Sequence, residues 1–246
     1  MTYEPNMSVL EIAITYVCNV SCNNCLALSP QAPTKRDQDM TLEDIERFLA
    51  ESVACNYPWT WLKLHGGEPT LHRQLMEICH ALTAYKTASN PAVRLSLVSN
   101  DTNRKRVEEV LAAGFDPQLS YKAVGSSAIS YVPVNVSPKD IGVSADSGCF
   151  IPRDCGISLN NLGFWPCSPS AAAARVFDYE APVKHVQDLT PERLKVLYSH
   201  CDHCGFAIRQ ERTTQQMSSP TWATKLAAYN LKGKNTAEAQ NQSVKT

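Results

Sequence analysis

The stretch VLEIAITYVCNVSCNNC, from Val9 to Cys25, decides the fold of this chain. Its first half is an apolar run rich in β-branched residues, and it is short enough for a single buried strand. A polar loop follows at once and carries three cysteines, Cys18, Cys22 and Cys25. Chance alone would place this triple in a chain of the same composition about 0.02 times. The stretch therefore predicts a strand that ends in a loop built for the chemistry of three thiols.

Helix and strand patterns alternate after this loop. Thr41 can cap a helix whose apolar residues recur at helical spacing, and a short apolar strand pattern follows it. The alternating elements are expected at 42–53, 61–64, 71–82, 93–98, 107–111 and 118–123. Strands that alternate with amphipathic helices form parallel βαβ units, whose ligands sit at the carboxyl edge of the sheet. We therefore expect an α/β fold over about residues 8–140.

Composition narrows the class of protein. The 23 Lys and Arg residues against 24 Asp and Glu leave a formal charge of −1, which does not indicate a nucleic-acid partner. The sequence has neither an apolar stretch long enough to span a bilayer nor the features of a signal peptide at its start. We therefore expect a cytoplasmic protein without a membrane partner. Ten cysteines in a reducing compartment indicate metal binding or catalysis rather than disulfides.

The three thiols of the first loop can hold three corners of a [4Fe–4S] cluster. This arrangement leaves the fourth iron open to a ligand, whereas closed electron-transfer clusters use four cysteines. The alternatives are a structural zinc site or reduced thiols without metal. A second motif, His65-Gly66-Gly67-Glu68-Pro69-Thr70, ends the second expected strand. Its glycines allow a backbone to approach a ligand closely, and its carboxylate can accept a charge-assisted hydrogen bond from an ammonium group.

Together, these two motifs resemble those of the radical SAM superfamily. In that family, a cysteine triple of this spacing binds a [4Fe–4S] cluster at the end of the first barrel strand, and the open iron holds S-adenosylmethionine. The resemblance assigns this role to Cys18, Cys22 and Cys25. The stretch Gly66-Gly67-Glu68-Pro69 is similar to the family's GGEP motif, which contacts the amino group of the methionine.

The resemblance implies further cofactor contacts at later strand ends. Ser99 and Asn100 resemble the family's strand-end polar motif, and Ser120 and Lys122 lie where the fourth strand often supplies a ribose contact. A helix cap or a turn is an equal alternative for these polar residues. The family often has an aromatic residue near the adenine just before the third cysteine, and this chain has Asn24 there.

A second set of cysteines lies in the C-terminal half: Cys149, Cys155, Cys167, Cys201 and Cys204. Residues 156–167 have the pattern of a β-hairpin, and a hairpin thiol combined with a distant Cys-x2-Cys can close a metal site, with zinc as one candidate. The set also resembles the twitch or SPASM-like extensions of radical SAM enzymes, which bind auxiliary [4Fe–4S] clusters. The spacing in the family favours Cys149 as the first ligand, while hairpin geometry favours Cys155. We expect one of these two to be spare.

The resemblance implies three regions. Residues 1–140 form a partial (β/α)6 TIM-like barrel that is the radical SAM core, and residues 141–210 form a small cysteine-rich iron–sulfur module of the twitch or SPASM type. Residues 211–246 are polar and are expected to form a partly disordered tail.

Several other residues are expected to be structural. Cys55 and Cys79 fall at or near apolar helical positions. The six histidines show no metal-ligand spacing, although His203, inside the Cys-x2-Cys, could bond to a cluster or ligate zinc. Arg175, which follows four alanines, is expected to be solvated.

The activity that the resemblance implies is reductive cleavage of S-adenosylmethionine to a 5′-deoxyadenosyl radical, which abstracts hydrogen from a substrate. An auxiliary cluster that accepts the second electron leads to dehydrogenation, and a spare thiol that donates a hydrogen atom leads to epimerisation. The barrel begins near residue 8, which leaves no room in front for a leader-peptide-binding domain, so a small polar substrate is favoured. The expected partner is a flavodoxin- or ferredoxin-type electron donor, and no residue is assigned as catalytic.

Two alternatives remain at this point. Within the superfamily, the chain could be a peptide- or protein-modifying enzyme or a glycyl-radical activase. From another class, it could be a non-catalytic iron–sulfur or zinc-binding protein, which the GGEP-like motif argues against.

Overall fold

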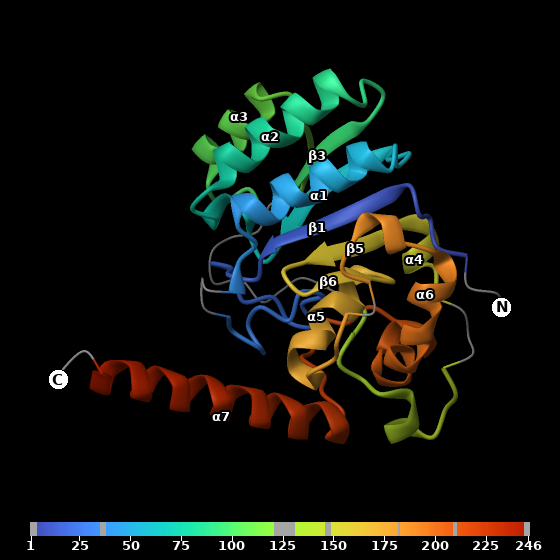
Figure 1. The fold of residues 1–246 in the computed structure, drawn as a ribbon. Coiled ribbons are helices and arrows are strands. Elements are labelled where there is room, and N and C mark those ends of the chain that lie inside the picture. The colour runs from blue at the N-terminus through green and yellow to red at the C-terminus, as the bar shows by residue number, and fades with distance from the viewer. Residues whose placement is uncertain are drawn as a thin grey trace.

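The computed structural model is an α/β protein built around one six-stranded sheet (Figure 1). It describes residues 4–34, 38–120, 131–145, 149–181, 183–208 and 211–243. The strands stand in the order β4-β3-β2-β1-β5-β6. Their bounds are β1 Val9–Thr15, β2 Trp61–Gly66, β3 Arg94–Ser99, β4 Asp116–Leu119, β5 Ile157–Asn160 and β6 Gly163–Trp165. The first five pair in parallel and β6 is antiparallel to β5, so the expected α/β class is confirmed.

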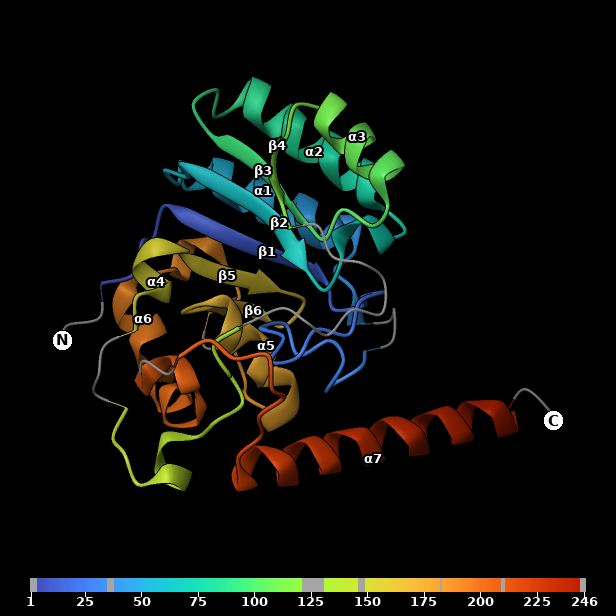
Figure 2. The same ribbon diagram turned by 180° about the vertical axis from the view of Figure 1, so that it is seen from behind.

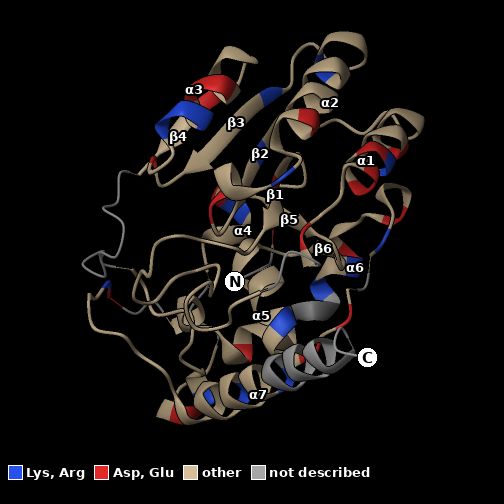
Figure 3. Cartoon of the chain, turned by 90° about the vertical axis from the view of Figure 1, so that its left-hand side faces the viewer, with Lys and Arg blue, Asp and Glu red and all other residues tan. Residues whose placement is uncertain are grey.

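Three helices cover one face of the sheet (Figures 1 and 2). They are α1 Leu42–Ala54, α2 Leu75–Ala88 and α3 Arg104–Ala112. Alternate strand residues, such as Ile12 and Leu64, are fully buried against these helices because side chains alternate across a strand. Thr41 begins α1 in a capping box with Asp44, as its sequence indicates. Charged residues lie along each of these three helices (Figure 3).

The opposite face of the sheet, here called the inner face, carries polar residues. Glu11 in β1 and Lys63 in β2 are register partners, and the Lys63 Nζ lies 3.5 Å from the Glu11 Oε1. Lys63 is only 4% exposed, and it also donates a hydrogen bond of 3.0 Å to the backbone carbonyl of Cys155. A buried charge is tolerated only when it is paired in this way. The sheet therefore separates an apolar core on one side from a polar lining on the other.

The C-terminal half adds two strands to the same sheet. The hairpin expected at 156–167 is present as β5 and β6, but it belongs to the barrel sheet, because β5 pairs in parallel with β1. Gly156 makes this approach possible, since a Cβ there would lie 2.2 Å from the carbonyl oxygen of Val9. Its φ of +91° also favours glycine. The chain thus differs from the expected arrangement, in which the hairpin belongs to a separate module.

Shorter elements and one long helix complete the fold. The helices are α4 Ile151–Asp154, α5 Ser168–Phe177, α6 Pro191–Lys195 and α7 Pro220–Ser243, and the 3-10 helices are η2 Pro69–Leu71, η3 Pro138–Ile141, η4 Val186–Asp188, η5 Val196–His203 and η6 Gly205–Ile208. Among the described parts of the chain, every helix is too short or too polar to cross a lipid bilayer.

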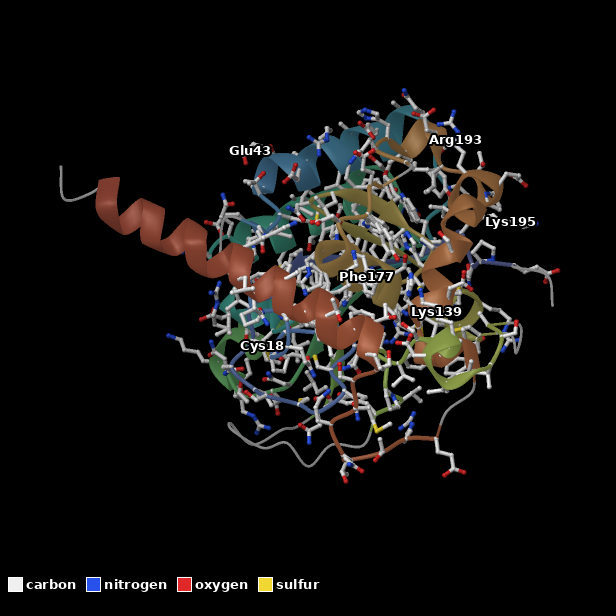
Figure 4. The ribbon with its side chains drawn as sticks, turned by 90° about the horizontal axis from the view of Figure 1, so that it is seen from below. Cys18, Glu43, Lys139, Phe177, Arg193 and Lys195 are labelled. Carbon is white, nitrogen blue, oxygen red and sulfur yellow. The ribbon has the colours of Figure 1, made fainter. Side chains whose placement is uncertain are left out.

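Residues 211–243 differ from the partly disordered tail expected for 211–246. Helix α7 runs across the molecule on the side of α5 (Figure 4). Trp222 fixes the start of α7, because its side chain is fully buried and its ring meets that of Phe177 edge-on at 4.8 Å. The polar composition of this segment did not indicate the helix, whose contacts with the body, such as those of Trp222 and Tyr229, lie far away in the chain.

Candidate functional site

The first cysteine loop, residues 16–34, follows the carboxyl end of β1. Burial raises the pKa of the Cys18 thiol, a hydrogen bond to the Val20 backbone lowers it, and the charges of Cys25, Glu68 and Cys22 raise it further. Cys18 lies beside the motif that ends β2, because the Asn100 Nδ2 is 3.8 Å from the Cys18 sulfur while the Asn100 N–H donates to Glu68. Its thiol is also coupled to those of Cys22 and Cys25 in the same loop.

The two glycines of that motif lie against the backbone of β1 and the loop. A Cβ on Gly66 would stand 1.9 Å from the carbonyl oxygen of Thr15, and a Cβ on Gly67 would stand 2.4 Å from that of Val17. The Gly67 N–H and the Glu68 N–H donate to these same two carbonyl groups, each at 2.8 Å. The glycines are therefore needed to join the end of β2 to the root of the cysteine loop, a role that the sequence analysis did not foresee.

Glu68 is fully buried and ties three segments together. Its Oε1 accepts hydrogen bonds from the Thr70 backbone at 3.0 Å, the Thr70 hydroxyl at 2.6 Å and the Ser99 hydroxyl at 2.8 Å. Its Oε2 accepts one from the Asn100 backbone at 2.8 Å. Four donors that converge on one carboxylate fix the ends of β2 and β3 relative to each other. Oε2 accepts one bond against three at Oε1, so it is the less occupied of the two oxygens.

We expect Glu68→Gln to lower the free energy of unfolding by about 2–4 kcal/mol. In either orientation, the NH2 group of the new amide would face a group that now donates to the carboxylate, either the Asn100 N–H or the donors of Thr70 and Ser99. Urea unfolding of the anaerobic protein measures this change. Thr70→Val is the matched control, because it removes one donor and keeps the carboxylate, and it should cost less. Equal unfolding midpoints for wild type and Glu68→Gln would contradict the role of this carboxylate.

The strand-end residues of β3 and β4 meet the site unequally. Asn100 is 4% exposed, and its Nδ2 lies 3.8 Å from the Cys18 sulfur and 3.1 Å from the Asn19 Oδ1. Ser120 is exposed, and its backbone N–H donates to the Ser99 carbonyl at 3.0 Å. Lys122 lies outside the described residues. The structure thus brings Ser99 and Asn100 to the loop and leaves Ser120 at the rim.

Asn24, just before the third cysteine, has a role that the sequence did not reveal. It is fully buried with a φ of +51°, and its side chain bonds to the backbone of Thr213, Gln215 and Met217. These bonds fasten the segment 213–217 against the cysteine loop. Asparagine suits this position because it tolerates positive φ and carries both a donor and an acceptor.

The second set of cysteines divides into four and one. The charges of Cys149, Cys204 and Cys201 all raise the pKa of Cys167, after burial, which has the largest effect. Cys149 and Cys201 act in the same way on Cys204, and Cys149 acts on Cys201, whose pKa burial raises to about 12. Every pair within these four therefore interacts.

Cys155 stands apart from this group. Burial raises its pKa to about 11, and the charges that act on it belong to Glu11, Lys63, Asp154 and, last, Cys149. Its backbone carbonyl is occupied by Lys63. Cys149, Cys155, Cys167 and Cys204 all pack against one buried cluster, and the electrostatic coupling favours Cys149, Cys167, Cys201 and Cys204 as the interacting four.

His65, at the end of β2, adds an unpartnered nitrogen to the site. Burial lowers the pKa of His65, and a hydrogen bond to the Glu11 backbone and the Glu11 charge act in the opposite direction. A bond that raises a histidine pKa is one that the ring donates. Among the described residues, its Nε2 is closed from solvent and has no hydrogen-bond partner. The alternation of β2 could have placed His65 and Lys63 on one face, but not shown that this nitrogen lacks a partner.

Other candidate residues have structural surroundings. Cys79 is fully buried in the apolar core, as expected, whereas Cys55 is exposed at the end of α1. His203 stacks on Phe177 at 4.7 Å between ring centroids. Arg175, expected to be solvated, is only 8% exposed, and this expectation was wrong.

The chemistry of the donor sets fits iron–sulfur groups. Within the described ranges, no three side chains of His, Cys, Asp or Glu converge closely enough to hold one metal ion. A four-iron group asks for a wider arrangement, because each thiolate binds a different iron. Buried thiols whose charges repel one another stay protonated unless a cation is bound, and bound iron supplies that stabilisation. The loop thiols, with the Asn100 amide beside Cys18, thus have the character of cluster ligands.

Comparisons with known proteins agree with this geometry. Residues 12–124 match the family model described as "Radical SAM superfamily". The chain is 35% identical over 107 residues to a GTP 3',8-cyclase of Synechococcus elongatus, covering 43% of this chain and 31% of that protein. It is 35% identical over 108 residues to a probable GTP 3',8-cyclase of Pyrococcus horikoshii, covering 44% and 31%. The chain thus spans less than a third of the length of these relatives.

Solved structures extend the likeness to the rest of the fold. The crystal structure of BtrN in complex with AdoMet and 2-DOIA matches with a TM-score of 0.55 at 16% identity, covering 86% of this chain and 97% of that one. A crystal structure of BtrN in an open conformation matches with a TM-score of 0.52 at 15% identity, covering 80% and 86%. Residues 12–124 are thus similar to the radical SAM superfamily, and the fold as a whole is similar to that of BtrN.

Proposed function

We propose that this chain is a radical SAM enzyme that cleaves S-adenosylmethionine reductively and abstracts hydrogen from a small polar substrate. One observation carries the proposal. Asn100 joins Cys18 of the loop triple to Glu68 at the carboxyl edge of a parallel sheet, through contacts of 3.8 Å and 2.8 Å, inside the segment that matches the family model. This edge is where ligands of parallel α/β sheets bind.

The three loop thiols, Cys18, Cys22 and Cys25, are the proposed ligands of a [4Fe–4S] cluster. When bound, the cluster and S-adenosylmethionine supply a 5′-deoxyadenosyl radical. Three thiolates leave one iron without a protein ligand, so the cofactor has a place to bind. The chain itself contributes orientation and the exclusion of water.

The methionine end of the cofactor is proposed to lie against Gly66, Gly67, Glu68 and Pro69. The Glu68 Oε2, the less occupied oxygen, is the proposed acceptor of a bond from the ammonium group, and the four bonds within the protein hold the carboxylate in place. Asn100 and Ser99 stand next to this position, and Ser120 and Lys122 remain proposed contacts on the ribose side.

The C-terminal thiols are proposed to hold one auxiliary [4Fe–4S] cluster of the twitch or SPASM-like kind. Its proposed ligands are Cys149, Cys167, Cys201 and Cys204, because every pair among these thiols is electrostatically coupled. Of these four thiols, only Cys149 is among the groups that act on Cys155. Such a cluster can accept the electron that a dehydrogenation releases. Cys155 is then the spare thiol.

The position of Cys155 favours dehydrogenation over epimerisation. Because Ile157 pairs with Leu10, Cys155 lies at the amino end of β1, while the cysteine loop follows the carboxyl end. The seven residues of β1 span roughly 20 Å. An electron can cross such a distance through protein, but a hydrogen atom passes only between groups in near contact. Cys155 is therefore badly placed to donate hydrogen to a radical formed at the carboxyl edge.

The inner face favours a polar substrate. Glu11, Lys63 and His65 line it with a carboxylate, an ammonium and an imidazole whose Nε2 is unpartnered among the described residues. Small ligands are oriented by a few such groups in an otherwise apolar site. The partners we propose are a small molecule and a flavodoxin- or ferredoxin-type electron donor, in the cytoplasm.

Anaerobic reconstitution tests the proposal. The protein is loaded with iron and sulfide, the iron and acid-labile sulfide are counted, and dithionite is added with S-adenosylmethionine. Formation of 5′-deoxyadenosine and methionine supports the proposal. A fully loaded protein that leaves S-adenosylmethionine intact would contradict it and favour a non-catalytic iron–sulfur protein.

A further inference from the structure

Arg175 is a buried cation that reaches into the first cysteine loop from α5. Its Nη2 donates to the Ala27 carbonyl at 2.8 Å and its Nη1 donates to the Ala32 carbonyl at 3.1 Å. The centre of its guanidinium lies 3.8 Å from the centroid of the Tyr16 ring. The loop and α5 lie side by side in both ribbon views, beneath the carboxyl end of β1 (Figures 1 and 2). Arg175 thus contacts the loop on both sides of its cysteines.

Among the described residues, the groups that act most strongly on Arg175 include no carboxylate. Burial lowers the pKa of this guanidinium, and the groups that raise it are Tyr16, Tyr229 and Cys25. Phenol groups are neutral near pH 7, so of these three only the thiolate of Cys25 can supply negative charge. Within the same described ranges, the Arg175 Nε is buried without a hydrogen-bond partner. By contrast, the buried Lys63 is paired with Glu11.

An unbalanced buried cation is costly, and proteins retain one where a bound anion balances it. Three thiolates around a [4Fe–4S] group give the loop net negative charge, and reduction of the group adds one more electron. A fixed positive charge nearby stabilises the reduced form more than the oxidised form. Solvent screens this interaction little, because the side chain is only 8% exposed.

We propose that Arg175 is the countercharge of the cluster in the first cysteine loop and raises its reduction potential. This inference rests on the proposed function, since it assumes that the loop thiols hold a cluster. Arg175 touches no reacting atom and acts through the field that it places on the loop. Its two bonds to carbonyl groups hold the charge at a fixed distance from the ligands.

The test is a redox titration of the anaerobically reconstituted full chain, followed by electron paramagnetic resonance. The loop cluster is identified by the change in its signal when S-adenosylmethionine is added. Arg175→Gln should lower the ratio of reduced to oxidised loop cluster about tenfold at a fixed potential, which is a fall of 59 mV for a one-electron couple. Arg175→Lys keeps the charge and should keep the ratio within about threefold. Arg193→Gln is the control for net charge, because Arg193 is exposed in α6 and pairs with Asp188.

The two variants separate charge from anchoring. An anchor needs the guanidinium fork, so a purely structural Arg175 would make Lys fail as badly as Gln. If Gln loads less iron than wild type while Lys loads fully, the charge is needed even for assembly, which supports the proposal. An unchanged potential in a loaded Arg175→Gln protein, or loss of iron in both variants while the chain stays folded, would overturn it. Failure of wild type to form any cluster in the loop would overturn the proposed function instead.

Discussion

We expect the Cys22→Ala protein to form no 5′-deoxyadenosine under reducing, oxygen-free conditions. Cys22 is buried and lies in the middle of the loop triple, and its charge acts on Cys18. Two thiolates cannot hold three irons of a cluster, so the open iron that takes S-adenosylmethionine is lost with the group. The iron content of the reconstituted protein should fall by about four per chain. Iron analysis and chromatography of the nucleoside product measure both effects.

Cys55→Ala is the matched control for this experiment. Cys55 is an exposed thiol at the end of α1, away from both sets of interacting cysteines. It should retain the iron content and the product yield of wild type. Full retention of cleavage in Cys22→Ala, with Cys55→Ala unchanged, would remove the basis of the proposed activity.

The repeating part of the fold could be predicted because its signals are local. Short apolar runs indicated the strands, although the one expected at 118–123 is observed as β4 at Asp116–Leu119, and the Thr41 cap indicated the start of α1. Both signals depend on residues close together in the chain. The same holds for the hairpin turn between β5 and β6, which begins at Asn160 and ends at Gly163. The two motifs of the site were also readable, because each is a short run at a strand end.

Contacts between distant segments could not be predicted in this way. Gly66 and Gly67 were assigned to ligand approach, whereas they also allow close contact with β1. Arg175 was expected to face solvent, because the four alanines before it do not indicate any partner. Its partners are carbonyl groups of the cysteine loop, some 145 residues away in the chain. Helix α7 depends on Trp222, whose burial is decided by residues in α5 and η5. Each of these positions is set by tertiary packing.

The choice between Cys149 and Cys155 shows why spacing alone was insufficient. The hairpin register does place Gly156 level with Cys167, since Ser158 pairs with Trp165. From this register we expected Cys155, the neighbour of Gly156, to lie close to Cys167. In the structure, however, Cys149 has the largest charge effect on Cys167, whereas Cys155 directly follows α4 and its carbonyl is held by Lys63 on the inner face.

The auxiliary cluster can be tested with this pair of cysteines as matched variants. Wild type should bind about eight irons per chain, and Cys149→Ala about four, because four thiolates are needed to close an electron-transfer cluster. Cys155→Ala should still bind about eight, since Cys155 lies outside the interacting four. Iron, sulfide and zinc are counted in the same samples. Retention of about eight irons in Cys149→Ala, with loss of about four in Cys155→Ala, would show that the assignment of Cys149 is wrong.

Zinc is the alternative metal for the C-terminal cysteines, and a measurement of metal content distinguishes it from an iron–sulfur cluster. A zinc site would also join these distant segments, so both metals predict that Cys204→Ala loosens the region around residues 150–205, and stability cannot separate them. The metal content can, in a protein whose three loop cysteines are all replaced by alanine. About four irons should remain if Cys149, Cys167, Cys201 and Cys204 hold a cluster. Near-zero iron with one zinc per chain would mean that the site cannot accept an electron, because zinc is not redox-active. Dehydrogenation would then lose its support.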